Sequence, residues 1–550
     1  MPANKFRRRL IGPMQLLQAS AFALSLGLLA ACETMPKAIA DLPLIGKGAS
    51  MPSPVGPLAP PAARTWPNEA TDVLNQRARG FGLVNAPDMQ RYLNQLYARI
   101  KTQAGVPAWP GAVHILANDA LNAYATGAGN IYISMPWLSS VESEDELVAL
   151  LSHEFGHIYL HYHQLEGAVD DANTTAGVVS VGFAIVKKTG QATGWTQLDS
   201  LTTAYMLGRG LVTTIYSRSQ ESAADNFGLN LSVKLGYSYE HGMKAFLERM
   251  ATWEDKNAVR EKEQQEQMIK AVRQQALDNA MKGGGRPPDN ALTQSIAQGS
   301  GEISGGINSA MKQLGFELNK AAAKLRSDHP ETTERIDALA LAVEPFPDIQ
   351  SGKDAVTAPL KRALQERRTA GIFKNYALAF KAINAPKEAA SVEAARNAVT
   401  APTATHAVPL FALYTVLNEQ PAAAGKKMQD PGQLLEANFN AEPDRAWKTY
   451  QERSAKLKDA RQAAAAKKVL DAGLAYFQNA EEVWPDAIRF YGEAQGWDEA
   501  KRMAANCGKN FRRVSERCAQ AASSPAELAE VERKSKVKAE QIVDNMFKKK

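Results

Sequence analysis

Three residues in one short segment have the types needed to bind a metal ion and to activate water. The chain reads His153-Glu154-Phe155-Gly156-His157, which separates the two histidines by four positions. In a helix this spacing puts both imidazoles on one face, where they can take neighbouring corners of a tetrahedral zinc site. Glu154 then lies beside the open corner and can take a proton from a water molecule there. The segment therefore predicts zinc-assisted hydrolysis.

Zinc in such a site requires a third protein ligand, and Glu221 is the best candidate. Glu221 and Asp225 are four positions apart and share one helix face. The small residues Ala224 and Gly228 allow that face to pack closely against another helix. Glu221 would complete a site of two histidines and one glutamate, and Asp225 would accept a hydrogen bond from a ligand histidine.

Two further histidines, His161 and His163, are closer in sequence but fit less well. His161 lies two turns beyond His153, about 12 Å away along a straight helix. His163 falls on a different face of the same helix. We interpret both as part of a polar helix end near the site.

Two helices and a small sheet are expected to position these residues. Residues 143–146, Ser-Glu-Asp-Glu, fit a capping box that starts the helix with the two histidines. A second helix, predicted over about 213–235 with a stop at Gly236, carries the candidate third ligand. Short strands are predicted at 113–116 and 130–134, ahead of both helices.

Four motifs are spread along this part of the chain. They are Asn122-Ala123-Tyr124-Ala125 ahead of a glycine-rich turn and strand; His153-Glu154-x-x-His157; Ser217-Arg218-x-x-Glu221-x-x-x-Asp225-x-x-Gly228; and Ser327-Asp328-His329-Pro330 followed by Arg335-Ile336. Together they resemble the HtpX-like and CAAX prenyl protease family of zinc endopeptidases over about Asn68 to Leu341. The resemblance implies an α+β fold, a mainly helical zincin domain of the gluzincin type with a small sheet, and one Zn²⁺ per chain.

The resemblance also implies roles for individual residues. His329 would face the metal, where it either stabilises the oxyanion or occupies the open position in the absence of substrate. Arg335 would pair with an acid near the site. The strand at 130–134 would be the sheet edge to which an extended peptide adds a strand before cleavage. The substrate-binding residues expected on this basis are Asn122, Asn130, Ile131, Tyr132 and Ile133.

The beginning of the chain has the pattern of a lipoprotein leader. Residues 1–31 carry four cations and no acid, with an apolar run that ends directly before Cys32. We interpret 1–31 as a signal peptide, Cys32 as the lipidated residue and the Pro-rich stretch 32–67 as a tether. A transmembrane anchor is the alternative, which polar residues within the run weaken. Glu33 after the lipidated cysteine favours the periplasmic side of the outer membrane over the inner membrane.

Composition narrows the function classes further. The chain has 550 residues, of which 45% are hydrophobic and 22% are charged, which excludes a multi-span membrane protein, a collagen and a largely disordered chain. Removing the four leader cations lowers the formal net charge from +6 to +2. A nearly neutral chain has no electrostatic footprint for nucleic acid, so no nucleic-acid partner is expected.

The peptidase-like region covers residues 68–345, and the sequence that follows it predicts helices. The Ala-rich stretch 346–525 fits a degenerate tetratricopeptide-like array and an irregular all-helical domain equally well. Within the peptidase-like region, the charged and glycine-rich stretch at about 254–306 predicts a flexible insert, and 526–550 predicts a charged tail. Cys507 and Cys518 are expected to form a disulfide in an oxidising periplasm.

These observations predict a lipid-anchored zinc endopeptidase that degrades misfolded or stalled envelope and outer-membrane proteins. The alternative is a chaperone-like assembly factor for outer-membrane proteins, in which proteolysis is rare and gated. The partners expected are unfolded or misassembled envelope proteins, outer-membrane barrels foremost. The assembly machinery of the outer membrane is a second expected partner, contacted through the C-terminal helical domain.

Overall fold

The computed structural model describes residues 55–161, 216, 218–256, 332–350, 352–424, 430–442, 444–478, 480–528 and 530. Several sequence expectations fall outside these residues. They are the leader with Cys32, the histidine His163, the 327–330 motif with His329, most of the 254–306 insert and most of the 526–550 tail. Within the described residues, no helix has both the length and the apolar character needed to cross a membrane.

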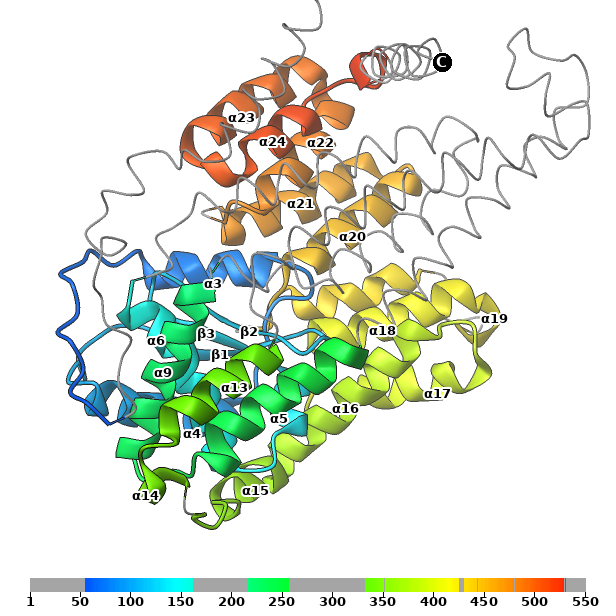
Figure 1. Ribbon diagram of the computed structural model, residues 1–550. Helices are drawn as coiled ribbons and strands as arrows, with labels where there is room; N and C mark the ends of the chain where they lie inside the picture. Colours follow the sequence, from blue (N-terminus) through cyan, green and yellow to red (C-terminus); the bar gives the residue numbers. More distant parts are fainter. Residues whose placement is uncertain are drawn as a thin grey trace, which may run out of the picture. The chain divides into compact units, whose positions relative to one another are not determined.

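The described residues are mainly helical and contain one small sheet, as expected for an α+β protein (Figure 1). The elements up to residue 350 are α3 (Glu69–Ala78), α4 (Pro87–Gln103), β1 (Val113–Leu116), β2 (Ala123–Ala125), β3 (Ile131–Ser134), α5 (Met135–Ser140), α6 (Glu144–Tyr159), α9 (Arg218–Lys234), the π-helix η2 (Glu240–Lys244), α13 (Thr332–Val343) and α14 (Pro347–Gln350).

The remaining elements are all helical. They are α15 (Ala358–Gln365), α16 (Arg367–Asn384), α17 (Ala389–Ala398), α18 (Ala407–Glu419), α19 (Pro421–Ala424), the 3-10 helix η3 (Pro431–Asn438), α20 (Trp447–Asp459), α21 (Ala463–Phe477), α22 (Val483–Gln495), α23 (Trp497–Asn510), the 3-10 helix η4 (Arg512–Val514) and α24 (Ser515–Ala521).

The sheet has the strand order β1-β3-β2, with β1 parallel and β2 antiparallel to β3. Apolar side chains such as Ile115, Ile131 and Ile133 pack into the main hydrophobic core together with residues of α4 and α6. Tyr132, between the two isoleucines of β3, belongs instead to a small cluster that includes Val73 of α3. Because side chains alternate along a strand, α6 and α3 pack against opposite faces of this sheet.

Helix α6 begins as the sequence predicts. The Ser143 side chain accepts a hydrogen bond from the Glu146 backbone N–H, and acidic residues fill the first turn. The partner helix α9 begins at Arg218, five positions later than the predicted 213, and Tyr216 lies outside it. A Cβ atom added to Gly228 of α9 would lie only 2.9 Å from the backbone N of His153. The absence of a side chain at this position therefore allows α9 to approach the histidine-bearing turn of α6.

The interpretation of residues 32–67 as a tether is wrong for the last part of this stretch, because that part binds α6 and α9. The Gly56 carbonyl accepts hydrogen bonds from Asn230 and Lys234, at 2.9 and 2.7 Å. The Arg64 guanidinium donates to the carbonyls of Ile158 and Tyr159, where α6 ends. Lone carbonyls at a helix end are good acceptors for a cation, which explains this contact in a segment without regular structure.

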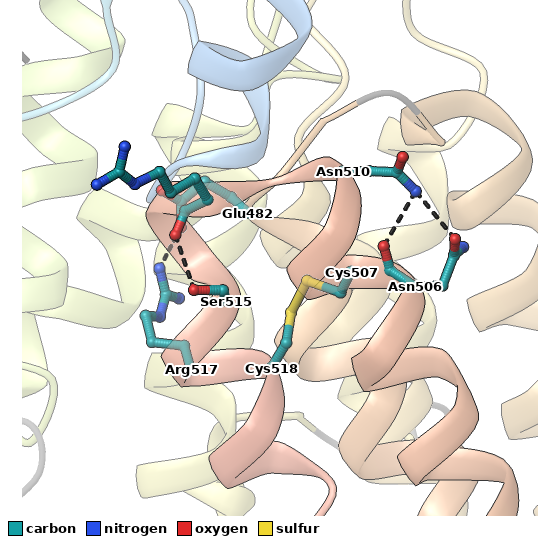
Figure 2. The surroundings of a disulfide bond; sticks show 8 residues. Glu482, Asn506, Cys507, Asn510, Ser515, Arg517 and Cys518 are labelled. Carbon is teal, nitrogen blue, oxygen red and sulfur yellow. Dashed lines mark hydrogen bonds and ion pairs between the residues drawn. A yellow bond between two sulfur atoms is a disulfide. The ribbon is translucent and has the colours of Figure 1, made fainter.

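The main hydrophobic core continues past residue 345, because buried side chains of α15, α16, α17 and α18 belong to it. Two smaller clusters hold together α20–α22 and α22–α24. In the second of these, a disulfide joins Cys507 of α23 to Cys518 of α24 (Figure 2), the pairing that the cysteine count predicts. Both cysteines are fully buried.

Candidate metal centre

Two histidines of α6 and one glutamate of α9 bring their ligand atoms together. The Nε2 atoms of His153 and His157 lie 3.2 Å apart. Each is 3.6 Å from one carboxylate oxygen of Glu221. Among the described residues, these three side chains form the one group of His, Cys, Asp and Glu whose ligand atoms could hold a metal ion, and all three are buried.

The donor set and its spacing fit zinc. Two nitrogens that bind one tetrahedral Zn²⁺ at the usual bond length are separated by about 3.3 Å, close to the separation of the two Nε2 atoms. Two imidazole nitrogens this close can share only one proton, whereas both can direct lone pairs at a cation. His161 is not in the group: it follows the end of α6 with a φ of 66°.

Glu154 lies next to His153 on α6 and is also buried. The backbone N–H of Ala125, in β2, lies near its carboxylate and favours the charged form. Burial raises the pKa of Glu154 to about 7, and the charge of Glu221 adds to this rise. A carboxylate with such a pKa can both accept and return a proton near neutral pH, which is the property required of a general base.

Behind the candidate metal ligands lies a buried network of charges. Arg335 of α13 donates two hydrogen bonds to the Asp225 carboxylate, at 2.8 and 2.6 Å, and its Nη1 lies 3.2 Å from Glu221. Asp225 Oδ1 lies 2.9 Å from the Nδ1 atom of His153, on the side of the ring opposite the ligand nitrogen. Arg335 thus pairs with an acid near the site, and Asp225 lies beside the His153 ring.

The charges in this network are matched. Burial alone would raise the pKa of Asp225, but the Arg335 guanidinium and the hydrogen bonds hold that pKa well below its ordinary value. A carboxylate that stays charged can orient the His153 ring and direct its Nε2 toward a metal.

Tyr216 is a site residue to which the sequence analysis assigned no role. Its ring stacks on the His157 ring, with centroids 3.7 Å apart and planes 7° from parallel. Burial raises the pKa of the Tyr216 hydroxyl, and the carboxylates of Glu154 and Glu221 raise it further. The sequence feature that could have indicated a role for Tyr216 is its position, as an aromatic residue directly ahead of the Ser217-Arg218 motif.

The prediction that the strand at 130–134 is a sheet edge for an extended peptide is wrong, because β3 is the central strand. Both of its edges are paired, and Asn130, Ile131, Tyr132 and Ile133 are fully buried. Asn130 instead accepts a hydrogen bond from the Ala112 N–H, and Ile131 and Ile133 fill the core. Asn122 joins the same hairpin, because its carbonyl accepts from the Ser134 N–H.

Within the described residues, β2 has an edge that no other strand pairs with. Hydrogen bonds from Ser134 N–H to the Asn122 carbonyl and from Thr126 N–H to the Asn130 carbonyl fix which residues of β2 face β3. By alternation, the backbone groups of Ala123 and Ala125 point away from β3. Since β2 packs on α6 and the Ala125 N–H lies near Glu154, this outer edge of β2 runs alongside the candidate catalytic carboxylate.

The arrangement is that of a metal-dependent hydrolase: two histidines and a glutamate on paired helices, with a second glutamate beside them. Residues 87–342 match the profile of Peptidase family M48. The chain thus carries a domain of this metallopeptidase family, which bears out the family resemblance of its motifs.

Curated relatives give a consistent picture at low identity. The chain is 24% identical over 181 residues to the beta-barrel assembly-enhancing protease of Escherichia coli (strain K12), which covers 32% of this chain and 36% of the relative. The protein of the same name from Yersinia pestis is 23% identical over 181 residues. A putative beta-barrel assembly-enhancing protease of Vibrio cholerae is 22% identical over 171 residues. The chain spans about a third of the length of these relatives.

Proposed function

We propose that this protein is a zinc-dependent endopeptidase of the bacterial envelope. The observation that carries the proposal is the convergence of His153, His157 and Glu221 with Glu154 beside them, inside the segment that matches Peptidase family M48. Zinc, when bound, supplies a Lewis acid that lowers the pKa of water and polarises a peptide carbonyl.

The residues of the chain then have separable tasks. Glu154 takes a proton from the attacking water and later delivers it to the leaving amine as the peptide C–N bond breaks. Asp225 and Arg335 keep the His153 ring in its orientation. We assign His329, outside the described residues, to stabilising the oxyanion. An extended peptide would add to the outer edge of β2 at Ala123 and Ala125.

We propose unfolded or stalled outer-membrane proteins as the substrates. The names of the relatives support this choice, because they connect a related peptidase to beta-barrel assembly. The predicted leader with Cys32 supports a lipid anchor, and Glu33 supports the periplasmic side of the outer membrane. The disulfide of α23 and α24 supports an oxidising compartment.

The proposal is tested by digestion of an unfolded outer-membrane barrel protein. Zinc-loaded protein from residue 33 onward is compared with its Glu154→Gln variant, which keeps the zinc ligands and loses the base. We expect cleavage by the wild type, retention of zinc by Glu154→Gln, and a loss of cleavage by about 10³-fold or more in that variant. His153→Ala is the control that should lose zinc as well. Equal cleavage by Glu154→Gln would remove the proposed base.

A second function, as a chaperone-like assembly factor with gated proteolysis, draws on the helical C-terminal part. There α20 packs on α21 and α22 packs on α23, in consecutive helical pairs. Paired helices of this kind form client-binding surfaces in repeat proteins. Faster cleavage by His329→Ala than by the wild type would support gating, whereas a simple loss of activity would make His329 catalytic.

A further inference from the structure

Helix α3 holds the turn between β2 and β3 through one carboxylate. Oδ2 of Asp72 accepts three hydrogen bonds: from Thr126 Oγ1 at 2.8 Å, from Asn130 Nδ2 at 2.8 Å and from the Tyr132 hydroxyl at 2.7 Å. One helical turn later, Gln76 Oε1 accepts a hydrogen bond of 2.6 Å from the Tyr124 hydroxyl.

These donors lie at successive places along one hairpin. Tyr124 is in β2, Thr126 follows β2, and Asn130 precedes β3, which contains Tyr132. The Asp72 carboxylate therefore fastens both sides of the turn, and a charged acceptor makes each of these hydrogen bonds stronger than a neutral pair would.

The hairpin needs such a fastening because β2 is weakly held by the sheet. β2 has three residues and, within the described part of the chain, pairs with β3 alone. An isolated two-stranded ribbon of this length is at most marginally stable in water. The side chains bound by α3 add four hydrogen bonds on the face of the sheet opposite α6.

The same hairpin touches the proposed chemistry. β2 packs on α6, the Ala125 N–H lies near the Glu154 carboxylate, and the outward backbone groups of β2 form the outer edge beside that carboxylate. A shift of β2 would thus move both the partner of the base and the edge offered to a peptide. Helix α3 lies outside the segment that matches Peptidase family M48, which begins at residue 87.

We propose that Asp72 is a positioning residue of the active site: by holding the β2–β3 hairpin, it sets the place of Ala125 against Glu154 and the alignment of an extended substrate. This inference rests on the proposed peptidase function. It assigns to an element ahead of the family-matched segment a part in substrate alignment and in the orientation of the base.

The test compares Asp72→Ala and Asp72→Asn with two controls in the full chain. Glu69→Gln removes a negative charge from an exposed position of the same helix. Asn75→Ala loosens α3 on another side, because the Asn75 side chain accepts a hydrogen bond from the backbone N–H of Glu481 at 2.9 Å. The readouts are kcat and KM for an extended peptide, zinc affinity in a chelator competition, and hydrogen exchange of residues 122–134.

We expect Asp72→Ala to lower kcat/KM by about 10- to 100-fold, through both a lower kcat and a higher KM, because small displacements of positioned groups have effects of this size. Zinc affinity should stay within about twofold of the wild type, since the hydrogen bonds of Asp72 go to the hairpin and not to the ligands. Exchange at 122–134 should become faster, while exchange in α6 should not. Asp72→Asn keeps one acceptor oxygen, so its kcat/KM and its hairpin exchange should fall between those of the wild type and those of Asp72→Ala.

Other outcomes would overturn the inference. One is equal kinetics and equal hairpin exchange in Asp72→Ala and Glu69→Gln. Another is an equal loss of kcat/KM in Asn75→Ala, which would make α3 a general stabiliser. If the wild type cleaves nothing, the proposed function fails on its own. Hairpin exchange then still decides whether Asp72 holds β2, and unchanged exchange would reject that role.

Discussion

The helices of the candidate metal centre and the helices α20–α24 bury different kinds of side chain. At the site, Glu221, Asp225 and Arg335 are buried within a few ångströms of one another. In α20–α24, aromatic rings pack on glycine instead: a Cβ added to Gly473 would lie 2.9 Å from the rings of Trp447 and Tyr450. Buried charges give little net stability but fix geometry, whereas apolar packing gives most of the stability. Substitutions in the two regions should therefore have effects of different kinds.

The largest stability effect should come from Arg335→Met. This variant leaves the buried carboxylates of Glu221 and Asp225 without their cation, and losing one partner of a buried pair costs about 3–5 kcal/mol. The measurement is urea unfolding of the metal-free protein in the presence of a chelator. Arg249→Met is the control, because the side chain of Arg249, which pairs with Glu146, is 23% exposed and should matter less. Equal losses in the two variants would remove the special status of the site network.

The helical region can be weakened without touching the site. The double variant Cys507→Ala, Cys518→Ala opens a disulfide that spans 11 positions of the chain. A closed loop of that length contributes about 3 kcal/mol, mainly by restricting the unfolded chain. We expect a lower melting temperature for α22–α24, with zinc affinity and cleavage of a short peptide unchanged. Loss of zinc binding in this variant would mean that the two regions are coupled.

A smaller effect is expected where the segment before α3 meets the end of α6. Arg64→Ala removes a cation from the terminal carbonyls of α6 and from the face of the Trp109 ring, 4.3 Å away. Helix-end and cation–π contacts of this kind contribute about 1–2 kcal/mol together. Arg64→Lys keeps the positive charge and should restore part of this stabilisation. Arg91→Ala, with a side chain that is 65% exposed, should leave the melting temperature near that of the wild type.

The sequence predicted the parts of the site that follow from spacing within one helix. His153 and His157 share a face because they are four positions apart, and Ser143 caps α6 because its side chain reaches a nearby backbone N–H. The motif match extended this to Glu221, which lies on another helix. These relations are local or are recorded in the family pattern, so a single chain reveals them.

The contacts that the sequence did not reveal are long-range. β2 provides the outer edge beside Glu154, but Ala-Tyr-Ala is too short and too poor in β-branched residues to signal a strand. β3 gives a strong strand signal because its residues are apolar. The same residues are buried, as expected for the central strand of the sheet. Asp72 reads as an ordinary acid in the first turn of a helix, and its three partners lie more than 50 positions away.

Two aspartates, one in the candidate metal centre and one in α20–α24, have opposite pKa shifts. Asp225 faces a cation, and its pKa is lowered. Asp486 in α22 accepts a hydrogen bond of 2.8 Å from the Trp447 indole, and burial raises its pKa. A raised pKa means that the folded chain holds the proton more tightly than the unfolded chain. Ionised Asp486 therefore lowers stability progressively as the pH rises from its unfolded pKa through its folded pKa.

Asp486→Asn should have the smallest effect and a defined sign. The amide oxygen still accepts from Trp447 and carries no charge at any pH, so the variant should be more stable than the wild type at pH 8. The gain should shrink toward pH 4, where the wild-type carboxyl takes up its proton. Melting temperatures across this range measure it. Trp447→Phe removes the donor that lowers the pKa of Asp486 and should enlarge the gain from Asp486→Asn at pH 8. A gain that is constant with pH would mean that packing around the substituted side chain, and not the charge of the wild-type carboxylate, sets the difference.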